Sequence, residues 1–388
     1  MDNVRIGVIG LGNMGTSHAR ELLKQKVKGA QLAAVCDTRQ SQLDWAEREL
    51  GEGVARFDRV EALLASGTVD GVLIATPHYD HAEIAIQAFR NGLHVLVEKP
   101  AGVYTKQVRL MNEAAAASDR VFGIMYNQRT NPLYQKLRDL IQSGELGEVR
   151  RTNWIITNWY RSQSYYDSGG WRATWGGEGG GVLINQDPHQ LDLWHWTTGL
   201  TPKRIRAFCY FGKHRRIEVE DEVTAYVEYD NGATGVFVTT TGEAPGTNRF
   251  EVAGDRGKIV IEDGKLTFWR LRVSEREFNS TYTGGFGQPE CWKCDVPIAD
   301  HEGAQHVGIM QDWTNAIRNG TPLLAPGEDG IHGLTLSNAM LLSAWTDNWV
   351  DLPMDEDLFY DLLQERIRAS VSDKKTGEYQ QLNVQGTH

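Results

Sequence analysis

The chain contains 388 residues, of which 40 are Lys or Arg and 51 are Asp or Glu, giving a formal net charge of −11. At roughly 100–200 residues per domain, this length predicts two or three domains with substantial cores. Hydrophobic residues make up 40% and charged residues 23%, proportions that exclude a wholly disordered chain. The net negative charge argues against a protein that coats nucleic acid or an anionic membrane.

The sequence has no apolar run near the roughly 18–20 residues of a membrane span and no leader-like start, so we expect a cytoplasmic protein without a membrane partner. The cysteines are too few for a disulfide scaffold and fit reduced thiols. They are Cys36, Cys209, Cys291 and Cys294. Trp and Tyr are abundant, at 12 and 13 residues, and their clustering is typical of packed platforms or ring-binding clefts.

The first third of the chain alternates short β-branched segments with helix-forming segments. Strands are expected at residues 4–9, 31–35, 71–75, 94–97 and 121–125, and helices at 17–26, 40–50, 61–66, 81–91 and 105–117. Apolar strands that alternate with helices of about 10–15 residues predict an α/β domain with a doubly wound parallel sheet. We assign residues 1–125 to this first domain.

After about residue 126 the pattern changes to strands with polar and apolar residues in alternation. Strands are expected at 150–159 and repeatedly between 204 and 269, helices at 133–143, 187–197, 303–319 and 328–345, loops at 161–181 and 283–300, and an irregular tail from 371. Hairpin turns such as Asp230-Asn231-Gly232 indicate a mostly antiparallel sheet. We assign residues 126–388 to a second, α+β domain built on a large open sheet.

A glycine-rich motif directly follows the first strand and opens a helix. It reads Gly10-Leu11-Gly12-Asn13-Met14-Gly15. Gly10 suits a tight turn, Gly12 lets the backbone approach a pyrophosphate, and Gly15 lets the helix pack closely on the strand. Because N–H groups at a helix N-terminus bind phosphates, Asn13 and Met14 join the glycines as expected cofactor contacts.

Asp37 ends the second strand, 22 residues beyond Gly15. An acidic residue at this place accepts hydrogen bonds from the adenosine ribose and repels a 2′-phosphate, which favours NAD over NADP. Arg39 is close enough in sequence to bind a 2′-phosphate. The sequence therefore predicts an NAD site and leaves NADP, or use of both, open.

Two further polar segments follow buried strands, at the sheet edge where ligands of such folds bind. Thr76-Pro77 follows one strand and Glu98-Lys99-Pro100 follows the next. A lysine beside a dinucleotide site can hydrogen-bond a substrate hydroxyl and stabilise charge developing on its oxygen. Taken alone, a lysine in such a turn is also typical of a solvated surface.

Together these segments resemble the Gfo/Idh/MocA oxidoreductases, the family of glucose–fructose oxidoreductase and inositol dehydrogenase. The resemblance lies in the order and spacing of GVIGLGNMG, Asp37, ATP at 75–77 and EKP at 98–100, and it extends to about residue 355. It implies a Rossmann first domain and identifies Lys99 as the catalytic lysine.

The same resemblance implies further contacts around the cofactor and substrate. Thr76, Pro77, Glu98 and Lys99 are expected to touch NAD, together with the glycine motif. The segment that begins Tyr126-Asn127 is similar to the family's domain junction, which lies near the nicotinamide and the substrate. We therefore expect Asn127 to bind the cofactor and Tyr126 the substrate.

Residues 179–192, GGGVLINQDPHQLD, resemble the family's G-G-x-L-x-D-x-G-x-H-x-x-D stretch. Alignment on the histidine makes His189 the catalytic histidine, with Asn185 where an aspartate is usual and Asp187 where a glycine is usual. Asn185 can hydrogen-bond a sugar hydroxyl but cannot act as a carboxylate. Asp187 could take over the role of that acid or could only cap the following helix. Asp192, three residues on, could orient the imidazole ring.

Aromatic and basic residues cluster between residues 159 and 175. Aromatic faces bind the apolar faces of pyranose or cyclitol rings, while charged side chains hold hydroxyl groups. We therefore expect Arg161, Trp171 and Arg172 in a substrate cleft. The alternative is an aromatic patch buried between subunits.

A metal site is not expected. Cys291-x-x-Cys294 with His301 and His306 offers zinc ligands, but the gap from Cys294 to His301 is short for the common finger spacing. The family resemblance implies no metal, so we predict a reduced thiol pair in a surface loop.

The resemblance implies reversible hydride transfer between NAD(P) and a secondary alcohol of a sugar, inositol or glycoside ring. His189 would remove the hydroxyl proton and Lys99 would polarise the same oxygen. Two other functions stay open: an NAD-dependent glycosidase that works by transient oxidation and elimination, and a non-catalytic NAD-sensing protein. An open sheet face buried on a second copy would explain the family's usual dimers and tetramers.

Overall fold

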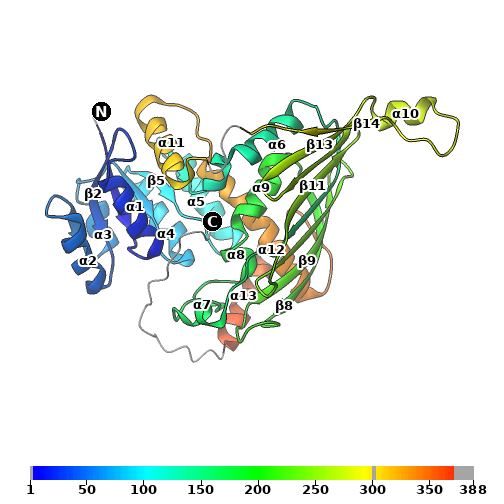
Figure 1. Cartoon of the computed structure of the whole chain (residues 1–388). Helices are drawn as coiled ribbons and strands as arrows, with labels where there is room; N and C mark the ends of the chain where they lie inside the picture. Colours follow the sequence, from blue (N-terminus) through cyan, green and yellow to red (C-terminus); the bar gives the residue numbers. More distant parts are fainter. Residues whose placement is uncertain (1–2, 299–302, 371–388) are drawn as a thin grey trace.

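In the computed structural model, which describes residues 3–298 and 303–370, the chain folds around a six-stranded and a nine-stranded β-sheet (Figure 1). The first sheet is parallel, with the strand order β3-β2-β1-β4-β5-β6. Its strands are β1 (Val4–Ile9), β2 (Ala30–Cys36), β3 (Ala55–Phe57), β4 (Gly71–Ile74), β5 (His94–Val97) and β6 (Phe122–Ile124).

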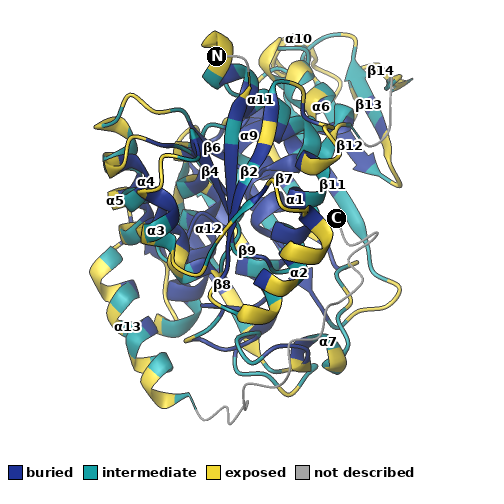
Figure 2. Ribbon diagram, turned by 90° about the vertical axis from the view of Figure 1, so that its left-hand side faces the viewer, coloured by how far each residue is buried: buried dark blue, intermediate teal, exposed yellow. Residues whose placement is uncertain are grey.

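The helices of the first half alternate with these strands, as the sequence predicts. They are α1 (Asn13–Leu23), α2 (Gln40–Leu50), α3 (Val60–Leu64), α4 (His81–Arg90) and α5 (Thr105–Ala116). In Figure 2 the strands of this sheet are buried, whereas α2 exposes its outer face to solvent. The strand order reverses between β1 and its neighbours β2 and β4, which opens a crevice at the carboxyl ends of these strands.

The second sheet is antiparallel except for the parallel pair β7–β10, and its order is β14-β13-β12-β11-β7-β10-β9-β8-β15. Its strands are β7 (Val149–Ile156), β8 (Pro202–Phe211), β9 (Glu220–Tyr229), β10 (Thr234–Thr240), β11 (Asn248–Gly254), β12 (Gly257–Glu262), β13 (Lys265–Leu271), β14 (Cys291–Asp295) and β15 (Val350–Asp351). The predicted fold class, a parallel sheet followed by a large and mostly antiparallel one, is confirmed.

Helices cover one face of this second sheet and leave the other open (Figure 1). The covering helices include α6 (Pro132–Gln142), α9 (Pro188–Thr198) and α12 (Gly330–Thr346). Because successive strand residues point to opposite faces, each strand buries one set of side chains and exposes the other. On β8, Ile205 and Ala207 are buried while Phe208 and Tyr210 are each about half exposed. The open face thus carries large aromatic side chains.

The chain returns to the first sheet after completing most of the second. Helix α11 (Gln305–Asn319) places the buried Trp313 against Gly71 and Gly123, so close that a side chain at either glycine would meet its ring. The N–H of Ile124 donates to the carbonyl of Ala325 at 3.1 Å. A late segment therefore completes the core of the N-terminal half, and the division at residue 125 remains a prediction from sequence.

Some elements are not predicted from the sequence. The expected loops at 161–181 and 283–300 contain α7 (Gln163–Asp167) and β14, and α10 (Glu275–Thr281) and α13 (Glu356–Ala369) lie in segments left unassigned. Helix α13 begins with a visible signal, because the Asp355 side chain accepts the N–H of Leu358 at 2.9 Å. The tail expected from residue 371 lies outside the described residues.

Candidate active site

A cavity of about 870 Å³ runs from the glycine turn to the helices of the second half. Its size suits a large ligand, since small-molecule sites commonly measure about 300–1,000 Å³. The predicted site residues that line it are Gly10, Gly12, Asn13, Met14, Asp37, Thr76, Pro77, Glu98, Lys99, Arg161, Trp171, Arg172, Asn185 and His189. Gly15, Tyr126, Asn127 and Asp187 are not among its lining residues. The fold thus brings most of the predicted cofactor and substrate residues to one cavity.

The glycine turn has the geometry that its motif predicts. Gly10 has φ +89°, and a Cβ there would lie 2.7 Å from the carbonyl oxygen of Ala75. A Cβ at Gly15 would lie 1.7 Å from the carbonyl oxygen of Gly10, so only glycine allows α1 to pack this closely on the turn. Helix α1 begins at Asn13, and its first turn has no acidic residue to repel a phosphate. The turn therefore fits the pyrophosphate of a dinucleotide.

Asp37 is fixed beside this turn. It is 7% exposed, and its Oδ2 accepts the N–H of Leu11 at 2.8 Å. Arg39 donates to the same carboxylate through Nε and Nη2, each at 3.1 Å. The carboxylate thus lines the cavity and can accept hydrogen bonds from a ribose. It also binds the Arg39 guanidinium, which could otherwise pair with the 2′-phosphate of NADP. This donor set fits NAD.

Asp37→Asn is expected to raise the dissociation constant for NAD about tenfold, the effect of losing one charged hydrogen bond. The amide can still accept the N–H of Leu11, so the turn should stay folded. Affinity for NADP should rise relative to affinity for NAD, because the charge that repels the 2′-phosphate is gone and Arg39 is released. Titration of both cofactors by fluorescence measures the shift, with the exposed Asp119→Asn as control. Unaltered NAD affinity would remove the ribose contact from the interpretation.

Glu98 and Lys99 follow β5 and point into a buried environment. His18 Nε2 lies 2.6 Å from Glu98 Oε1. Burial acts to raise the pKa of Glu98, but the hydrogen bond and charge of His18 outweigh it and lower that pKa to about 2. Glu98 is therefore an anion held beside Lys99.

Lys99 reaches from the first half of the chain to the second. Its Nζ donates to the backbone carbonyl of Asn185 at 2.9 Å, at the end of the short helix α8 (Val182–Asn185). Burial lowers the pKa of Lys99, while the carboxylates of Glu98 and Glu178 oppose this shift. A partly buried ammonium group with a fixed hydrogen bond is suited to act on a substrate oxygen.

His189 lies in the first turn of α9 and lines the same cavity as Lys99. Its ring packs edge-on against the buried Tyr126 ring, with 6.3 Å between the centroids. The Asp192 carboxylate, three residues on, accepts from the buried Arg129 through both oxygens, at 2.9 and 2.6 Å. Packing against Tyr126 helps to position the ring, and an orienting role for Asp192 stays a prediction.

Asp187 precedes α9 but makes no capping hydrogen bond with its side chain. The carboxyl group is fully buried, and burial raises its pKa well above the ordinary range, an effect that the nearby polar side chains of Thr239 and Trp159 only partly oppose. The capping alternative is therefore wrong. Asp187 thus lies behind the cavity wall, where burial disfavours its ionised form and the charge of Lys99 acts to lower its pKa.

The aromatic segment contributes one wall of the cavity. Trp159, Tyr165 and Trp171 line it together with the two predicted arginines. Trp175, in contrast, is buried in the core against Phe211 and Trp345, with ring centroids 5.8 and 5.5 Å away. The cluster is thus divided between the cavity and the core.

Some lining residues have no sequence prediction. Gln186 and Gln190 flank His189 on the same wall. The buried Glu178 contacts the Asn185 amide and accepts the N–H of Ala173 at 2.6 Å. The closeness of both glutamines to His189 in the sequence could have indicated them. Glu178 lies in a glycine-rich segment without a periodic pattern, so only the folded chain places it at Asn185.

The described part of the chain has neither a metal-binding cluster nor a membrane-spanning helix. No group of three or more His, Cys, Asp or Glu side chains there could hold a metal ion. His301, one of the zinc ligands considered from sequence, lies outside the described residues. No helix in residues 3–298 or 303–370 is long and apolar enough to cross a membrane.

Comparison with curated proteins gives relatives of modest identity. The chain is 28% identical to scyllo-inositol 2-dehydrogenase (NAD(+)) of Bacillus subtilis strain 168, over 82% of this chain and 96% of that protein. It is 31% identical to the rhizopine catabolism protein MocA of Rhizobium meliloti over 53% of this chain, an alignment that spans 61% of that relative.

A solved structure and two family models agree with these relatives. The WlbA dehydrogenase of Bordetella pertussis, solved with NADH and UDP-GlcNAcA, superposes with a TM-score of 0.75 at 25% identity, over 91% of this chain and 100% of that one. Residues 4–126 match the oxidoreductase family with an NAD-binding Rossmann fold, and residues 134–260 match the GFO/IDH/MocA C-terminal domain. With the two matches covering more than half its length, the chain is an NAD-binding oxidoreductase of the Gfo/Idh/MocA family.

Proposed function

We propose that this protein oxidises a secondary alcohol of a sugar, inositol or glycoside ring with NAD, reversibly, with Lys99 and His189 as the catalytic residues. The observation that carries the proposal is that both side chains line one cavity with the glycine turn and Asp37. The relatives named as inositol dehydrogenases, and the dehydrogenase structure with NADH and a nucleotide sugar, support the same class of reaction.

The roles follow from the chemistry of each group. Bound NAD supplies a hydride acceptor, and all other functions fall to the protein. His189 takes the proton from the substrate hydroxyl, since the unperturbed pKa of an imidazole lies near neutral pH. Lys99 donates a hydrogen bond to the same oxygen and stabilises the charge that develops there. The Asn185 carbonyl keeps the ammonium group aimed at that oxygen.

Other residues are proposed to hold the ring. Tyr165, Trp159 and Trp171 offer aromatic faces for the apolar side of a ring. Asn185 offers its amide to a hydroxyl group, with Arg161 and Arg172 beside it. Tyr126, Asn127 and Asp187 lie outside the lining residues, so we assign them to support of the site from behind its wall.

The direct test is a screen for formation of reduced nicotinamide by absorbance. NAD and NADP are supplied in parallel with inositols, aldoses, anhydrosugars and aryl glycosides. We expect NADH formation with one of these groups and weaker or no reaction with NADP. Hydrolysis of an aryl glycoside without net NADH would favour the redox glycosidase instead. Binding of NAD without any reaction across the panel would contradict the dehydrogenase.

The open sheet face supports a proposal about assembly. It exposes three aromatic side chains, Phe208, Tyr210 and Tyr226, which are 53%, 50% and 39% exposed. Exposed apolar patches often mark surfaces that bind another protein. We propose that this face packs on a second copy to form a dimer or tetramer. Light scattering should give a multiple of the chain mass, and Phe208→Asp with Tyr226→Asp should shift it to one chain. A monomeric wild-type protein would contradict this assembly.

A further inference from the structure

Glu178 is a buried acidic residue within electrostatic range of Lys99. It is 1% exposed and lies outside the residues that line the cavity. A buried carboxylate destabilises the fold unless hydrogen bonds satisfy it. The contacts of this carboxylate therefore indicate why the chain keeps an acid at this place.

Both oxygens of the Glu178 carboxylate accept hydrogen bonds. Oε1 accepts from the side-chain amide of Asn185, and Oε2 accepts the N–H of Ala173 at 2.6 Å. The backbone contact keeps the carboxylate from turning away from the amide. Because a carboxylate only accepts hydrogen bonds, the Nδ2 end of the amide faces it. The side chain of Asn185 therefore has a single orientation.

The other end of the Asn185 amide is held from the aromatic wall of the cavity. Its Oδ1 accepts from Gln186 Nε2 at 3.0 Å and from the Tyr165 hydroxyl at 3.3 Å. Arg172 Nη1 donates to the oxygen of that hydroxyl at 2.8 Å, so the hydroxyl proton is available to Asn185. The amide is thus fixed at both ends.

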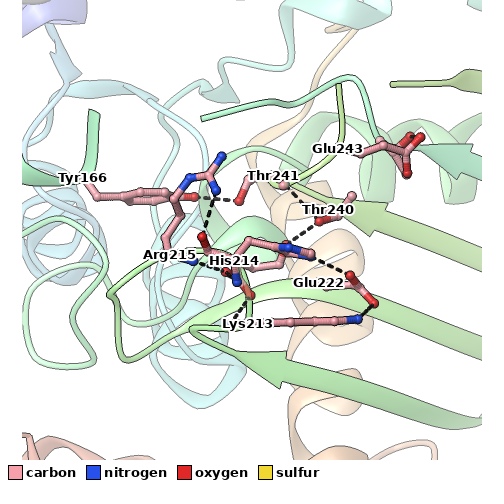
Figure 3. Close-up of polar contacts among 11 residues, drawn as sticks. Tyr166, Lys213, His214, Arg215, Glu222, Thr240, Thr241 and Glu243 are labelled. Carbon is pink, nitrogen blue, oxygen red and sulfur yellow. Dashed lines mark hydrogen bonds and ion pairs between the residues drawn. The ribbon is translucent and has the colours of Figure 1, made fainter. Parts of the chain in front are cut away.

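The tyrosine at this end is anchored on the second sheet. Tyr165 belongs to α7, where its ring packs edge-on against that of Tyr166, with 5.1 Å between the centroids. The Tyr166 hydroxyl donates to Thr241 Oγ1 at 2.9 Å, directly after β10 (Figure 3). The N–H of Thr241 donates to the backbone carbonyl of Asp221 at 2.9 Å. This anchor fixes α7 and with it the position of the Tyr165 hydroxyl.

The backbone around Glu178 is fixed as well as its side chain. Its carbonyl accepts from Nδ1 of His78, which follows β4, at 3.0 Å. The next residue, Gly179, has φ +86°, and a Cβ there would lie 2.3 Å from Val103 Cγ1. Only glycine allows the chain to pack this closely on the segment that follows Lys99. The glycine-rich sequence therefore brings one acidic residue to that segment.

The charges around Lys99 show what Glu178 contributes. Burial lowers the pKa of Lys99, and the guanidinium groups of Arg161 and Arg172 add to this effect. The carboxylates of Glu98 and Glu178 act in the opposite direction. Two acids from different parts of the chain thus favour the charged form of the ammonium group.

Asn185 cannot supply such a charge itself. It is neutral and stands where an aspartate is usual in the family. Asp187, the other acid of this segment, lies where burial disfavours its ionised form. Glu178, in contrast, contacts the Asn185 side chain directly, and the backbone carbonyl of the same asparagine accepts from the Lys99 ammonium at 2.9 Å.

Resting on the proposed function, we infer that Glu178 is a positioning residue for hydride transfer. Through the Asn185 side chain it fixes the residue whose carbonyl holds the Lys99 ammonium, and it places near Lys99 the negative charge that Asn185 lacks. It acts through these two residues and not on the substrate itself. The pair of Glu178 and Asn185 thereby replaces a single aspartate.

Glu178→Gln is the first test, since glutamine keeps the length of the side chain and an acceptor oxygen and removes the charge. We expect kcat to fall about tenfold, the effect of losing one charged hydrogen bond, while KM changes by less than about threefold. Lys99 acts in its protonated form, so activity is lost as the pH rises through its pKa. Without a carboxylate that raises this pKa, the basic limb of the kcat profile should move to lower pH.

Exchange of the two groups separates the charge from the structure. Glu178→Gln combined with Asn185→Asp moves the carboxylate to the other end of the same hydrogen bond, and it should restore most of kcat and the position of the basic limb. Glu218→Gln is the matched control, because Glu218 also accepts a backbone N–H of this segment, from Trp175 at 2.7 Å, and lies outside the lining residues. The control should keep the kcat and pH profile of the wild-type protein.

Titration of Lys99 gives a readout that needs no turnover. NMR spectra of the full-length protein with isotope-labelled lysine follow the side chain, and Lys99→Met assigns its signal. The pKa of Lys99 should be lower in Glu178→Gln than in the wild-type protein and should recover in the exchange variant. This result without hydride transfer on any substrate would support the placement of Glu178 and contradict the dehydrogenase alone.

Two outcomes would overturn the inference. The basic limb and the Lys99 titration could stay in place in Glu178→Gln, or the exchange variant could fail to restore them, which would make the role of Glu178 structural. If Glu178→Gln loses the circular dichroism spectrum of the wild-type protein, the exchange variant decides alone. A basic limb at the wild-type position then supports the inference, and a limb at lower pH contradicts it.

Discussion

Lys99→Met is expected to lower kcat by about 10²–10³-fold, the effect of removing one preorganised donor from a reacting oxygen. Methionine keeps the length and apolar volume of the side chain and removes only the ammonium group. The Asn185 carbonyl then loses its donor, and no positive charge faces the substrate oxygen from this side. Affinity for NADH should change by less than a few-fold, because the glycine turn and Asp37 are untouched.

Steady-state kinetics and NADH fluorescence together measure this effect. Lys106→Met is the matched control, because Lys106 is exposed on α5 and pairs with Asp357 at 2.6 Å, away from the cavity. The control should keep the kcat of the wild-type protein. A Lys99 variant with unchanged kcat would remove this lysine from the proposed mechanism, whereas equal losses of kcat and NADH affinity would make its role structural.

Glu220→Gln is expected to stabilise the folded protein above about pH 7. Burial raises the pKa of Glu220 to about 7, although the N–H groups of Gly181 and Leu183 donate to its Oε1 at 2.9 and 3.1 Å and oppose the shift. Its Oε2 has no hydrogen-bond partner among the described residues. Above that pH the folded protein contains a buried carboxylate, and one of its two oxygens receives no hydrogen bond to stabilise the negative charge.

The sign of the pH dependence follows from the two protonation states. In the unfolded chain Glu220 ionises near pH 4.5, whereas in the folded protein it stays protonated until about pH 7. Its contribution to stability is therefore complete below about pH 4.5 and is lost as the pH rises through 7. A shift of this size corresponds to about 3 kcal/mol. Glutamine keeps the acceptor oxygen and carries no charge, so the variant escapes this loss.

Urea unfolding of both proteins between pH 4.5 and 8 measures the difference. The variant should match the wild-type protein at the acidic end, exceed it increasingly up to about pH 7, and keep that advantage at pH 8. Glu222→Gln, two residues along β9, is the control of opposite sign, because Lys213 and His214 lower the pKa of Glu222 against the effect of burial. A difference for Glu220→Gln that stays constant over the pH range would contradict the assignment.

The sequence was most informative in the first half, where local patterns determine local structure. The glycine motif, the buried strands and the acid at the end of β2 are each encoded within a few residues, so the parallel sheet and the NAD site could be predicted. Short elements with weak periodicity were harder to predict. The short β14 and helices α7, α10 and α13 carry weak periodicity, although Asp355 gives α13 a visible start.

By itself, the sequence identified the dinucleotide turn, the two-sheet architecture, the family, and Lys99 and His189 as candidates for catalysis. Only the tertiary structure decided which groups face one another. It pairs Asp192 with Arg129, leaves Asp187 buried and not capping, and brings Lys99 to the Asn185 carbonyl. It also gathers Arg161 and Arg172 around one tyrosine ring. Hydrogen bonds of motifs and turns depend on neighbouring residues, whereas these contacts depend on packing between segments far apart in the chain, which no local pattern encodes.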